Sequence, residues 1–459
     1  MTLEKYQINQ KATLRETLRK IEANHEGCIL VTDDTERVVA IATDGDIRRK
    51  LLEDMSLDDP IMQCANSDFM AADSKTPREL LLKQLDQKIR LIPVLDENGR
   101  LVQVVTKKQM PIQIEEPVYA RARAPVRISF GGGGSDLTHF FSDHKGAVIN
   151  STISSYCHAT LRKRTDLKVI ISSLDLNEAL EADSLQDAFA HSGKFDLILA
   201  LLRTIQPAFG FELFINSDFP LKSGLGGSSA VSASILGCFN QFRQDRWDRH
   251  ELAELAFQAE RLYLDIAGGW QDQYATVFGG FNFMEFGMDQ TVVNPLRISN
   301  DILLELEESL ILCNTGIAHE SGEIHNDQRK TMLNAEIRAL VSRSVQITYQ
   351  LRNDLLRGRL LQFGQCLHEL WEIKRQLSGK ISNDELDNIY QAALDLGAIG
   401  GKILGAGGGG FFLFYVPPFK KHRLMTGLQK MGLTSLPFRF EAEGLHAWTI
   451  RERKQSLEN

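Results

Sequence analysis

The sequence predicts an α+β protein with a smaller α/β unit at its N-terminus. Three observations support this fold class: an internal repeat near the N-terminus, mixed helical and strand patterns after it, and three separated glycine-rich segments in that second part. A chain of 459 residues has room for several domains. We expect a repeat unit over 1–112, a linker over 113–120, and two lobes over 121–300 and 301–459.

The internal repeat is visible without gaps. Residues 29–47 (ILVTDDTERVVAIATDGDI) align on residues 92–110 (IPVLDENGRLVQVVTKKQM). Each copy has the pattern of a strand, a polar turn, a second strand and a helix start. The segment that follows, residues 111–120 (PIQIEEPVYA), has two prolines and no clear period, which is typical of a linker.

This repeat resembles a CBS domain pair over about residues 1–112. Because CBS pairs often bind adenine nucleotides between their halves, the resemblance implies AMP or another adenine nucleotide as a partner. The family's nucleotide motif, Thr followed by Asp three residues later, is present as Thr43 and Asp46 and is lost in the second copy, where Thr106 is followed by Gln109. A structural or dimerising module without a ligand is the alternative. CBS pairs often associate, so a homodimer is possible.

Composition narrows the class of partner. The net charge of −8 argues against nucleic acid as the main partner. No apolar run reaches the roughly 20 residues needed to span a bilayer, and the first ten residues lack the apolar core of a signal peptide. Six scattered cysteines without a CxxC pair fit a reduced cytoplasm, with the thiols as core residues. We therefore expect a cytoplasmic protein without a nucleic-acid or membrane partner.

The second glycine-rich segment, residues 221–230 (LKSGLGGSSA), predicts a phosphate-binding loop. Its glycines precede Ser228 and Ser229, and apolar residues then recur at helical spacing, at Val231, Ile235, Phe239 and Phe242. A glycine loop that opens a helix favours an anion, and we expect a nucleotide triphosphate there. No Lys-Ser/Thr follows the glycines, so this is not a Walker A motif. A serine cap after a tight turn is the alternative.

Two carboxylates follow this loop. In the helical segment 251–265, an apolar stripe is formed by Leu252, Leu255, Ala256, Ala259, Leu262 and Tyr263. Glu260 falls at the edge of this stripe, whereas Glu254 and Arg261 lie on the opposite face. An inward carboxylate calls for a partner, either Mg²⁺ or an arginine. Asp272 lies in a turn between glycine pairs, where it is either a catalytic group or a helix cap.

The first and third glycine-rich segments are candidates for substrate contacts. Residues 123–136 (RAPVRISFGGGGSD) let a sugar or phosphate approach the backbone, with Arg123 and Arg127 suited to anionic oxygens. Residues 400–412 (GGKILGAGGGGFF) predict close backbone packing beside the site, and Lys402 either approaches phosphate or is solvated. Residues 319–325 (HESGEIH) do not match HExxH, so we expect no metal site there.

The three glycine-rich segments, in this order, resemble the GHMP kinase family of small-molecule kinases over about residues 119–455. The resemblance implies a two-lobed fold, ATP and Mg²⁺ as cofactors, and phosphoryl transfer to a hydroxyl group. It assigns Mg²⁺ to Ser229 and Glu260, base catalysis to Asp272, and charge compensation to Arg123. The implied phosphate-binding residues are Ser223, Gly224, Gly226, Gly227, Ser228 and Ser229. The implied substrate-binding residues are Gly133, Gly134, Ser135, Asp136, Gly408 and Gly409.

Within this family the motifs are most similar to those of kinases that act on D-glycero-D-manno-heptose 7-phosphate. The resemblance implies phosphorylation of the anomeric hydroxyl of a sugar phosphate. One departure is His319, which stands where relatives would carry an arginine able to bind the substrate phosphate. Two alternatives remain: an anomeric kinase of a free sugar of the fucose or galactose type, and an adenylate-sensing regulatory protein whose kinase part is inactive.

Overall fold

The computed structural model describes residues 3–73, 76–85, 89–107, 117–264, 268–317 and 334–451, together with Ile324, Asp327 and Thr331. His319 and Gln109 lie outside the described residues. The chain divides into two compact units, Met1–Ile114 and Glu115–Asn459. Within the described part, no helix has the length and apolar character needed to cross a membrane. All six cysteines are buried and free, in accord with their expected place in the core.

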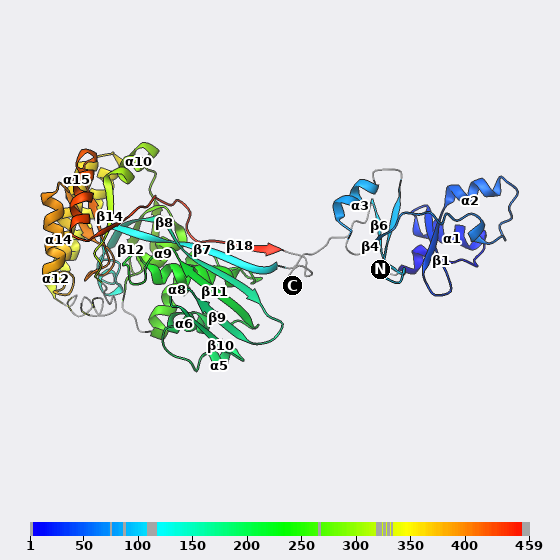
Figure 1. Ribbon diagram of the computed structural model, residues 1–459, viewed down its shortest axis with the longest axis horizontal. Helices are drawn as coiled ribbons and strands as arrows, with labels where there is room; N and C mark the ends of the chain where they lie inside the picture. The colour runs from blue at the N-terminus through cyan, green and yellow to red at the C-terminus, as the bar shows by residue number, and fades with distance from the viewer. Residues whose placement is uncertain are drawn as a thin grey trace. The chain divides into compact units, whose positions relative to one another are not determined.

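The N-terminal unit consists of two similar halves (Figure 1). The first half has the sheet order β1-β2-β3, with β1 (Gln7–Asn9), β2 (Cys28–Thr32) and β3 (Val38–Thr43). The second half has the order β4-β5-β6, with β4 (Ala72–Asp73), β5 (Leu91–Leu95) and β6 (Leu101–Thr106). The helices are η1 (Leu3–Tyr6), α1 (Leu14–Asn24), α2 (Asp44–Leu51), η2 (Ile61–Gln63) and α3 (Arg78–Leu85).

The predicted strand–turn–strand repeat is confirmed in both halves. In each half the two hairpin strands pair antiparallel, and the register shifts at the corresponding place, between Val31 and Thr32 and between Val94 and Leu95. The hairpin turns meet each other, because the Val38 amide donates a hydrogen bond of 3.0 Å to the Gly99 carbonyl.

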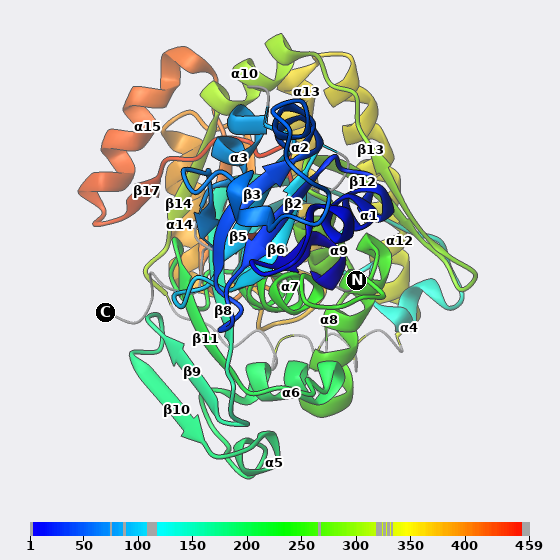
Figure 2. The same cartoon turned by 90° about the vertical axis from the view of Figure 1, so that its right-hand side faces the viewer.

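The larger unit is built on a twisted sheet with the order β10-β9-β11-β8-β12-β13, to which β7 adds on β8 and β18 adds on β7. Its strands are β7 (Pro117–Gly131), β8 (Gly146–Lys163), β9 (Val169–Ser173), β10 (Glu178–Ala182), β11 (Phe211–Ser217), β12 (Phe281–Phe286), β13 (Thr291–Pro295) and β18 (His446–Arg451). Both views show β9 and β10 projecting together with α5 (Leu185–Ala188) (Figure 2). Residues 117–120, which the sequence assigns to the linker, belong to β7; residues 113–116 lie outside the described part.

Besides α5, five described helices pack in the part of the chain that holds this sheet. They are α4 (Thr138–Phe141), α6 (Asp196–Ile205), α7 (Gly227–Asn240), α8 (Arg249–Leu264) and α9 (Gln271–Phe278). Helix α7 is rich in serine, alanine and glycine and is buried almost all round. A Cβ at Gly237 would lie 2.9 Å from a Leu445 methyl, so a larger residue at this position would displace that side chain. The dense packing fixes the N-terminus of α7 relative to the sheet.

The C-terminal part adds a second sheet, with the order β15-β16-β14-β17, and a layer of helices drawn in yellow to red in Figure 1. The strands are β14 (Leu310–Asn314), β15 (Gly400–Ile403), β16 (Phe411–Tyr415) and β17 (Thr434–Leu436). The helices are α10 (Asn300–Ser309), α12 (Ala335–Leu356), α13 (Leu360–Lys374), α14 (Asp384–Asp395) and α15 (Pro418–Lys430). Trp371 is fully buried and meets Phe412 edge-on, with ring centroids 5.4 Å apart. The expected α+β class is confirmed.

Candidate active site

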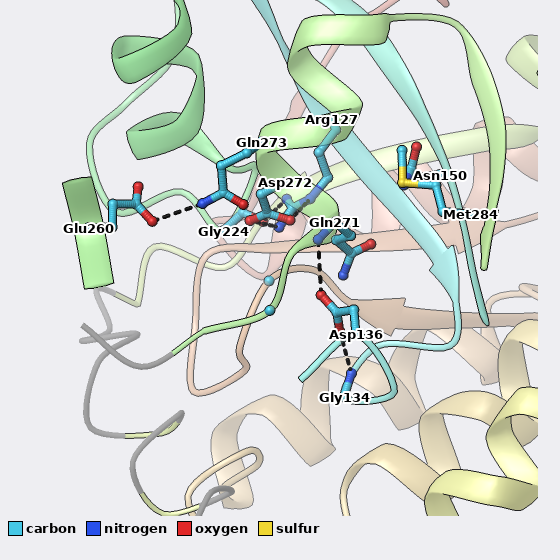
Figure 3. Close-up of polar contacts among 12 residues, drawn as sticks. Arg127, Gly134, Asp136, Asn150, Gly224, Glu260, Gln271, Asp272, Gln273 and Met284 are labelled. Atoms are coloured by element: carbon cyan, nitrogen blue, oxygen red, sulfur yellow. Dashed lines mark hydrogen bonds and ion pairs between the residues drawn. The ribbon is translucent and has the colours of Figure 1, made fainter. Parts of the chain in front are cut away.

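Arg127 on β7 and Asp272 on α9 form the centre of the candidate site (Figure 3). The Arg127 Nε and Nη2 atoms donate to the two Asp272 carboxylate oxygens at 2.8 and 2.6 Å. The remaining Nη1 atom donates to the Gly224 carbonyl at 2.7 Å. The arginine side chain is 4% exposed and the aspartate side chain 27%. This bidentate pair fixes the orientation of Asp272 while leaving it partly open to a ligand.

Asp272 does not cap its helix, which was the alternative left open by the sequence. The residue before α9 is Trp270, and no side chain caps this helix end. Asp272 lies in the first turn, where the helix dipole favours a negative charge. Its carboxylate is instead held by Arg127, so it faces the glycine-rich loop at Gly224 and Gly226.

The structure places Arg127, and not Arg123, at this centre. Arg123 lies over the Tyr156 ring at 5.0 Å and makes an exposed ion pair of 3.5 Å with Glu443. The two arginines are four residues apart, roughly 13 Å along a strand, and the pairing of β7 with β8 also shifts register between Pro125 and Arg127. Beyond the shift, the Arg127 amide donates to the Leu225 carbonyl at 2.9 Å, which joins β7 to the loop. The sequence offered Arg127 as a candidate, but two arginines on one strand could not be ranked without this irregularity.

Asp136 is held beside the same centre. Its carboxylate accepts hydrogen bonds from the Gly134 amide at 3.1 Å and the Gln271 amide at 3.2 Å. Burial raises its pKa, and the nearby charge of Asp272 adds to that rise. Any Cβ at Gly269 would lie 1.8 Å from an Asp136 oxygen, so glycine is required there. The first glycine-rich segment and the loop before α9 therefore meet at this carboxylate.

The four glycines and Ser135 divide into supporting and accessible residues. The Ser135 hydroxyl donates to the Gly132 carbonyl at 2.7 Å and is fully buried. It also accepts from the Ala147 amide, so it shapes the loop, and the expectation that it contacts substrate is not supported by its placement. Gly133 has open space where a Cβ would point, and Gly134 has only the end of a leucine side chain nearby. These two glycines form the accessible part of the loop.

The second and third glycine-rich segments are in contact. Gly226 has a φ of +80° and precedes α7, and a Cβ there would lie 3.4 Å from an Asp272 oxygen. Gly224, with a φ of +76°, lies against Leu404 and Gly405 of the third segment. Both loops therefore border the Arg127–Asp272 pair. Gly408 and Gly409, expected to contact substrate, are packed further along the third loop: the Gly408 amide donates to Ile381, and a Cβ at Gly409 would strike the Ile317 carbonyl.

Glu260 is buried, as the sequence predicted, and one of its two oxygens lacks a partner. Oε2 accepts from Gln273 at 2.9 Å (Figure 3). It also accepts from Arg261 at 3.4 Å, while Oε1 makes no hydrogen bond. Burial raises the Glu260 pKa, and the Arg261 and Ser228 side chains oppose that rise. An orphaned carboxylate oxygen of this kind fits a hard cation. Among the residues the structure describes, no group of three or more His, Cys, Asp or Glu could hold a metal by itself.

Helix α8 corrects two details of the sequence interpretation. Arg261 is not on the solvent face, because its guanidinium packs on the Phe257 ring at 4.5 Å and contacts Glu260. Leu262 and Tyr263, expected in the apolar stripe, are 67% and 46% exposed. The arginine that was the alternative partner to Mg²⁺ is thus present, but it occupies only one carboxylate oxygen.

Ser228 and Ser229, both expected at the phosphate loop, differ in burial. Ser229 is 1% exposed, because it starts the buried face of α7. Ser228 is exposed at the helix start, and its side chain interacts with Glu260. On a helix, neighbouring residues point about 100° apart, so only one of the two serines can face the Glu260 side. Ser228 is the serine whose side chain lowers the Glu260 pKa, which favours it over Ser229 as the residue on the Glu260 side. Ser223 is buried at the start of the loop.

The N-terminal unit has a cavity of its own, about 500 Å³ in volume. The expected nucleotide residues Thr43 and Asp46 do not line it, because they form a capping box at the start of α2, and Asp46 also pairs with Arg49. The adjacent Asp44 does line it, together with the basic residues Arg90 and Lys107 of the second half. The remaining lining residues are Leu18, Ile21, Glu22, His25, Glu26 and Gly27.

Family models match both units. The CBS domain matches residues 1–53 and 61–110. The GHMP kinases N-terminal domain matches residues 195–280, and the GHMP kinases C-terminal domain matches residues 351–424.

Individual relatives agree with these matches. The chain is 38% identical over 336 residues to D-glycero-alpha-D-manno-heptose 7-phosphate kinase of Campylobacter jejuni, covering 72% of this chain and 99% of that protein. It is 27% identical to an L-fucokinase/L-fucose-1-P guanylyltransferase of Bacteroides fragilis, over 68% of this chain and 36% of that protein. Among solved structures, a D-glycero-D-manno-heptose 1-phosphate kinase from Bacteroides thetaiotaomicron superposes with a TM-score of 0.60 at 28% identity, over 72% of this chain and 100% of that one. Galactokinase of Lactococcus lactis shares the fold, with a TM-score of 0.59 at 18% identity, over 72% and 95%.

Proposed function

Because the chain belongs to the GHMP kinase family and is a sugar kinase with an N-terminal CBS domain pair, we propose that it phosphorylates the anomeric hydroxyl of a sugar phosphate with ATP. The most specific form of the proposal is D-glycero-D-manno-heptose 7-phosphate as substrate and the 1,7-bisphosphate as product. The observation that carries it is the convergence of the Arg127–Asp272 pair with the glycine loop at Gly224. The 38% identity to a heptose 7-phosphate kinase supports the choice of sugar.

In this mechanism the residues of the centre divide proton transfer, charge compensation and ligand binding among them. Asp272 accepts the proton of the anomeric hydroxyl as that oxygen attacks the terminal phosphorus of ATP, and the bond from this phosphorus to the bridging oxygen breaks to release ADP. Arg127 holds Asp272 in place and offsets negative charge on the phosphoryl group. The free amides at the start of α7 bind the phosphates of ATP. Asp136, beside the accessible Gly133 and Gly134, accepts hydrogen bonds from sugar hydroxyls.

Ser228 and Glu260 are the residues that would hold Mg²⁺, and the unpartnered Glu260 Oε1 supports this assignment. Bound there with the phosphates, Mg²⁺ would neutralise charge on the triphosphate. Glu260→Gln is therefore expected to raise the Mg²⁺ concentration needed for half-maximal rate by roughly tenfold or more, within the 10- to 100-fold range typical of perturbed metal sites. A Mg²⁺ titration of the rate measures this. Glu254→Gln, on the same helix and near Tyr274, is the matched control. An unchanged titration would assign Glu260 to structure.

The choice of sugar is tested by a panel of acceptors with ATP. D-glycero-D-manno-heptose 7-phosphate, the unphosphorylated heptose, fucose and galactose are compared by kcat/KM. The proposal predicts the highest kcat/KM for the 7-phosphate. A higher kcat/KM for a free sugar would favour the alternative, an anomeric kinase of the fucose or galactose type. The 27% identity to a fucokinase is the observation that supports this alternative. If none of these acceptors supports ATP consumption, the result would favour a regulatory protein with an inactive kinase part.

For the CBS pair we propose that AMP or another adenine nucleotide binds in the 500 Å³ cavity and tunes the kinase. Arg90 and Lys107 supply positive charge for a phosphate, and the carboxylates of the cavity, Asp44, Glu22 and Glu26, are candidate acceptors for ribose hydroxyls. Arg90→Glu, or removal of residues 1–112, is expected to abolish any effect of AMP on the rate. Arg100→Glu makes the same charge reversal on a turn outside the cavity and is expected to retain the effect. An AMP effect that persists in Arg90→Glu and without residues 1–112 would place the regulatory site elsewhere.

A further inference from the structure

Two lysines of the third glycine-rich segment and its surroundings differ sharply in their partners. Lys374, at the end of α13, donates to the Ile403 carbonyl at 2.9 Å and to the Gly405 carbonyl at 2.7 Å. Lys402, on β15, is 4% exposed, and its side chain makes no hydrogen bond or ion pair with any residue that the structure describes. Of the two alternatives that the sequence left open for Lys402, a solvated side chain does not agree with this low exposure. A buried ammonium without a partner is unfavourable unless a ligand compensates it.

The charges that act on Lys402 come from three elements around the candidate site. Arg127 on β7 and Lys374 on α13 are like charges, and Asp136, after β7, is the opposing one. Asp136 is a poor partner, because its carboxylate already accepts two backbone amides. Burial, and then Arg127, lower the Lys402 pKa to about 7. Because Arg127 is already paired with Asp272, two ammonium groups, those of Lys374 and Lys402, face the one remaining carboxylate among these described charges, Asp136, when both lysines are protonated.

Lys402 also lies where the parts of the site meet. It precedes the loop that Lys374 anchors at Gly405, and that loop lies against Gly224. Gly224 accepts the Arg127 hydrogen bond, and Arg127 holds the proposed base Asp272. The anion that belongs between a phosphate loop and the base is the phosphoryl group in transfer, whereas a phosphate at the far end of the sugar would lie away from the base.

We propose that Lys402 binds, together with Arg127, the phosphoryl group that passes from ATP to the sugar. This inference rests on the proposed function, and it adds a catalytic residue to the reaction. A phosphoryl anion beside Lys402 restores the charged form of the ammonium. Binding of a nucleotide that carries the terminal phosphate is therefore accompanied by proton uptake when the pH lies above the pKa of Lys402 in the nucleotide-free protein.

The test compares binding of two magnesium nucleotides to the full chain at pH 8. Calorimetry with Mg·ADP and with Mg·AMPPNP, an ATP analogue that is not hydrolysed, is run in two buffers of different ionisation enthalpy. The wild-type protein is expected to take up about one proton more with AMPPNP than with ADP. In Lys402→Met this extra uptake disappears and AMPPNP affinity falls roughly thirtyfold or more, as for loss of one partner of a buried charge pair. Lys402→Arg keeps tighter AMPPNP binding without the extra proton uptake, because its guanidinium stays charged.

Thermal midpoints and two control variants, Lys374→Met and Lys430→Met, separate a role of Lys402 in nucleotide binding from a role in folding. Lys402→Met removes an uncompensated buried charge, so its thermal midpoint is expected to equal or exceed that of the wild type. Lys374→Met removes the donor to two carbonyls, so its midpoint is expected to fall. Lys430→Met, on the exposed end of α15, controls for loss of a lysine charge.

The outcomes that would overturn the proposal are specific. If Lys402→Met keeps the wild-type preference for AMPPNP over ADP and the wild-type proton uptake, Lys402 is excluded from the phosphoryl site. A wild-type protein that does not prefer AMPPNP to ADP would exclude it as well. Proton uptake that depends on Lys402 and appears with heptose 7-phosphate alone, not with AMPPNP, would assign the ammonium to the sugar's own phosphate. Failure of the proposed function looks different, because nucleotide binding is measured without a sugar.

Discussion

The Asp272→Asn variant is expected to lose roughly 10²–10⁴-fold in kcat, the usual contribution of a positioned general base. The amide keeps an acceptor for Arg127 but cannot take the proton of the anomeric hydroxyl. The two hydrogen bonds of 2.8 and 2.6 Å place the wild-type carboxylate at the glycine loop, so its loss should act on chemistry more than on nucleotide binding. Steady-state rates with saturating ATP and sugar phosphate measure the effect.

The matched control for this substitution is Asp218→Asn. Asp218 also pairs with a basic side chain, His158 at 3.2 Å, but the pair is 38–46% exposed on the surface. Near-normal kcat is expected for it. A kcat for Asp272→Asn within about threefold of the wild type, well short of the expected loss, would remove Asp272 from proton transfer.

The second large effect is expected for Arg127→Met, with kcat reduced roughly 10²–10³-fold, as for loss of a preorganised donor to the transition state. The change removes both hydrogen bonds to Asp272 and the one to the Gly224 carbonyl. Because Arg127 links the base to the phosphate loop, both kcat and the KM for ATP should worsen. Arg127→Lys should recover only part of the rate, since an ammonium cannot make the bidentate contact.

Arg123→Met is the control that distinguishes the two arginines of β7. Its guanidinium is 38% exposed and faces Glu443 and Tyr156, so we expect kcat to stay close to the wild-type value. The opposite ranking, with a large loss for Arg123→Met and little for Arg127→Met, would show that the β7 register seen here does not describe the active enzyme. Thermal midpoints of both variants exclude loss of folding as the cause.

Much of the fold could be predicted because its signals are local. The repeat of the N-terminal unit, the helix after the second glycine segment and the buried Glu260 all follow from periodicity and turn residues. The sequence also brought Asp272 and the glycine loops forward as one site. The sequence alone does not establish the contact between Gly224 and Gly405, because contacts between segments far apart in the chain leave no local pattern in the sequence.

The errors of the sequence interpretation have a common physical origin, which is side-chain direction. Ser228 and Ser229 differ by one helical step, and the packing of α7 decides which one is buried. The choice between Arg123 and Arg127 depends on an irregularity in β7 that propensity does not encode. Ser135 looked like a ligand residue, but its hydroxyl is used to close its own loop. Each of these needs tertiary contacts to be resolved.

The most direct test of the account is to incubate the protein with ATP and D-glycero-D-manno-heptose 7-phosphate and to identify the product by phosphorus NMR. The account predicts one ADP per sugar consumed and a product with two phosphates, one retained at carbon 7 and one new at the anomeric carbon. Release of inorganic phosphate without a new sugar phosphate, or a new phosphate at any other hydroxyl, would contradict it.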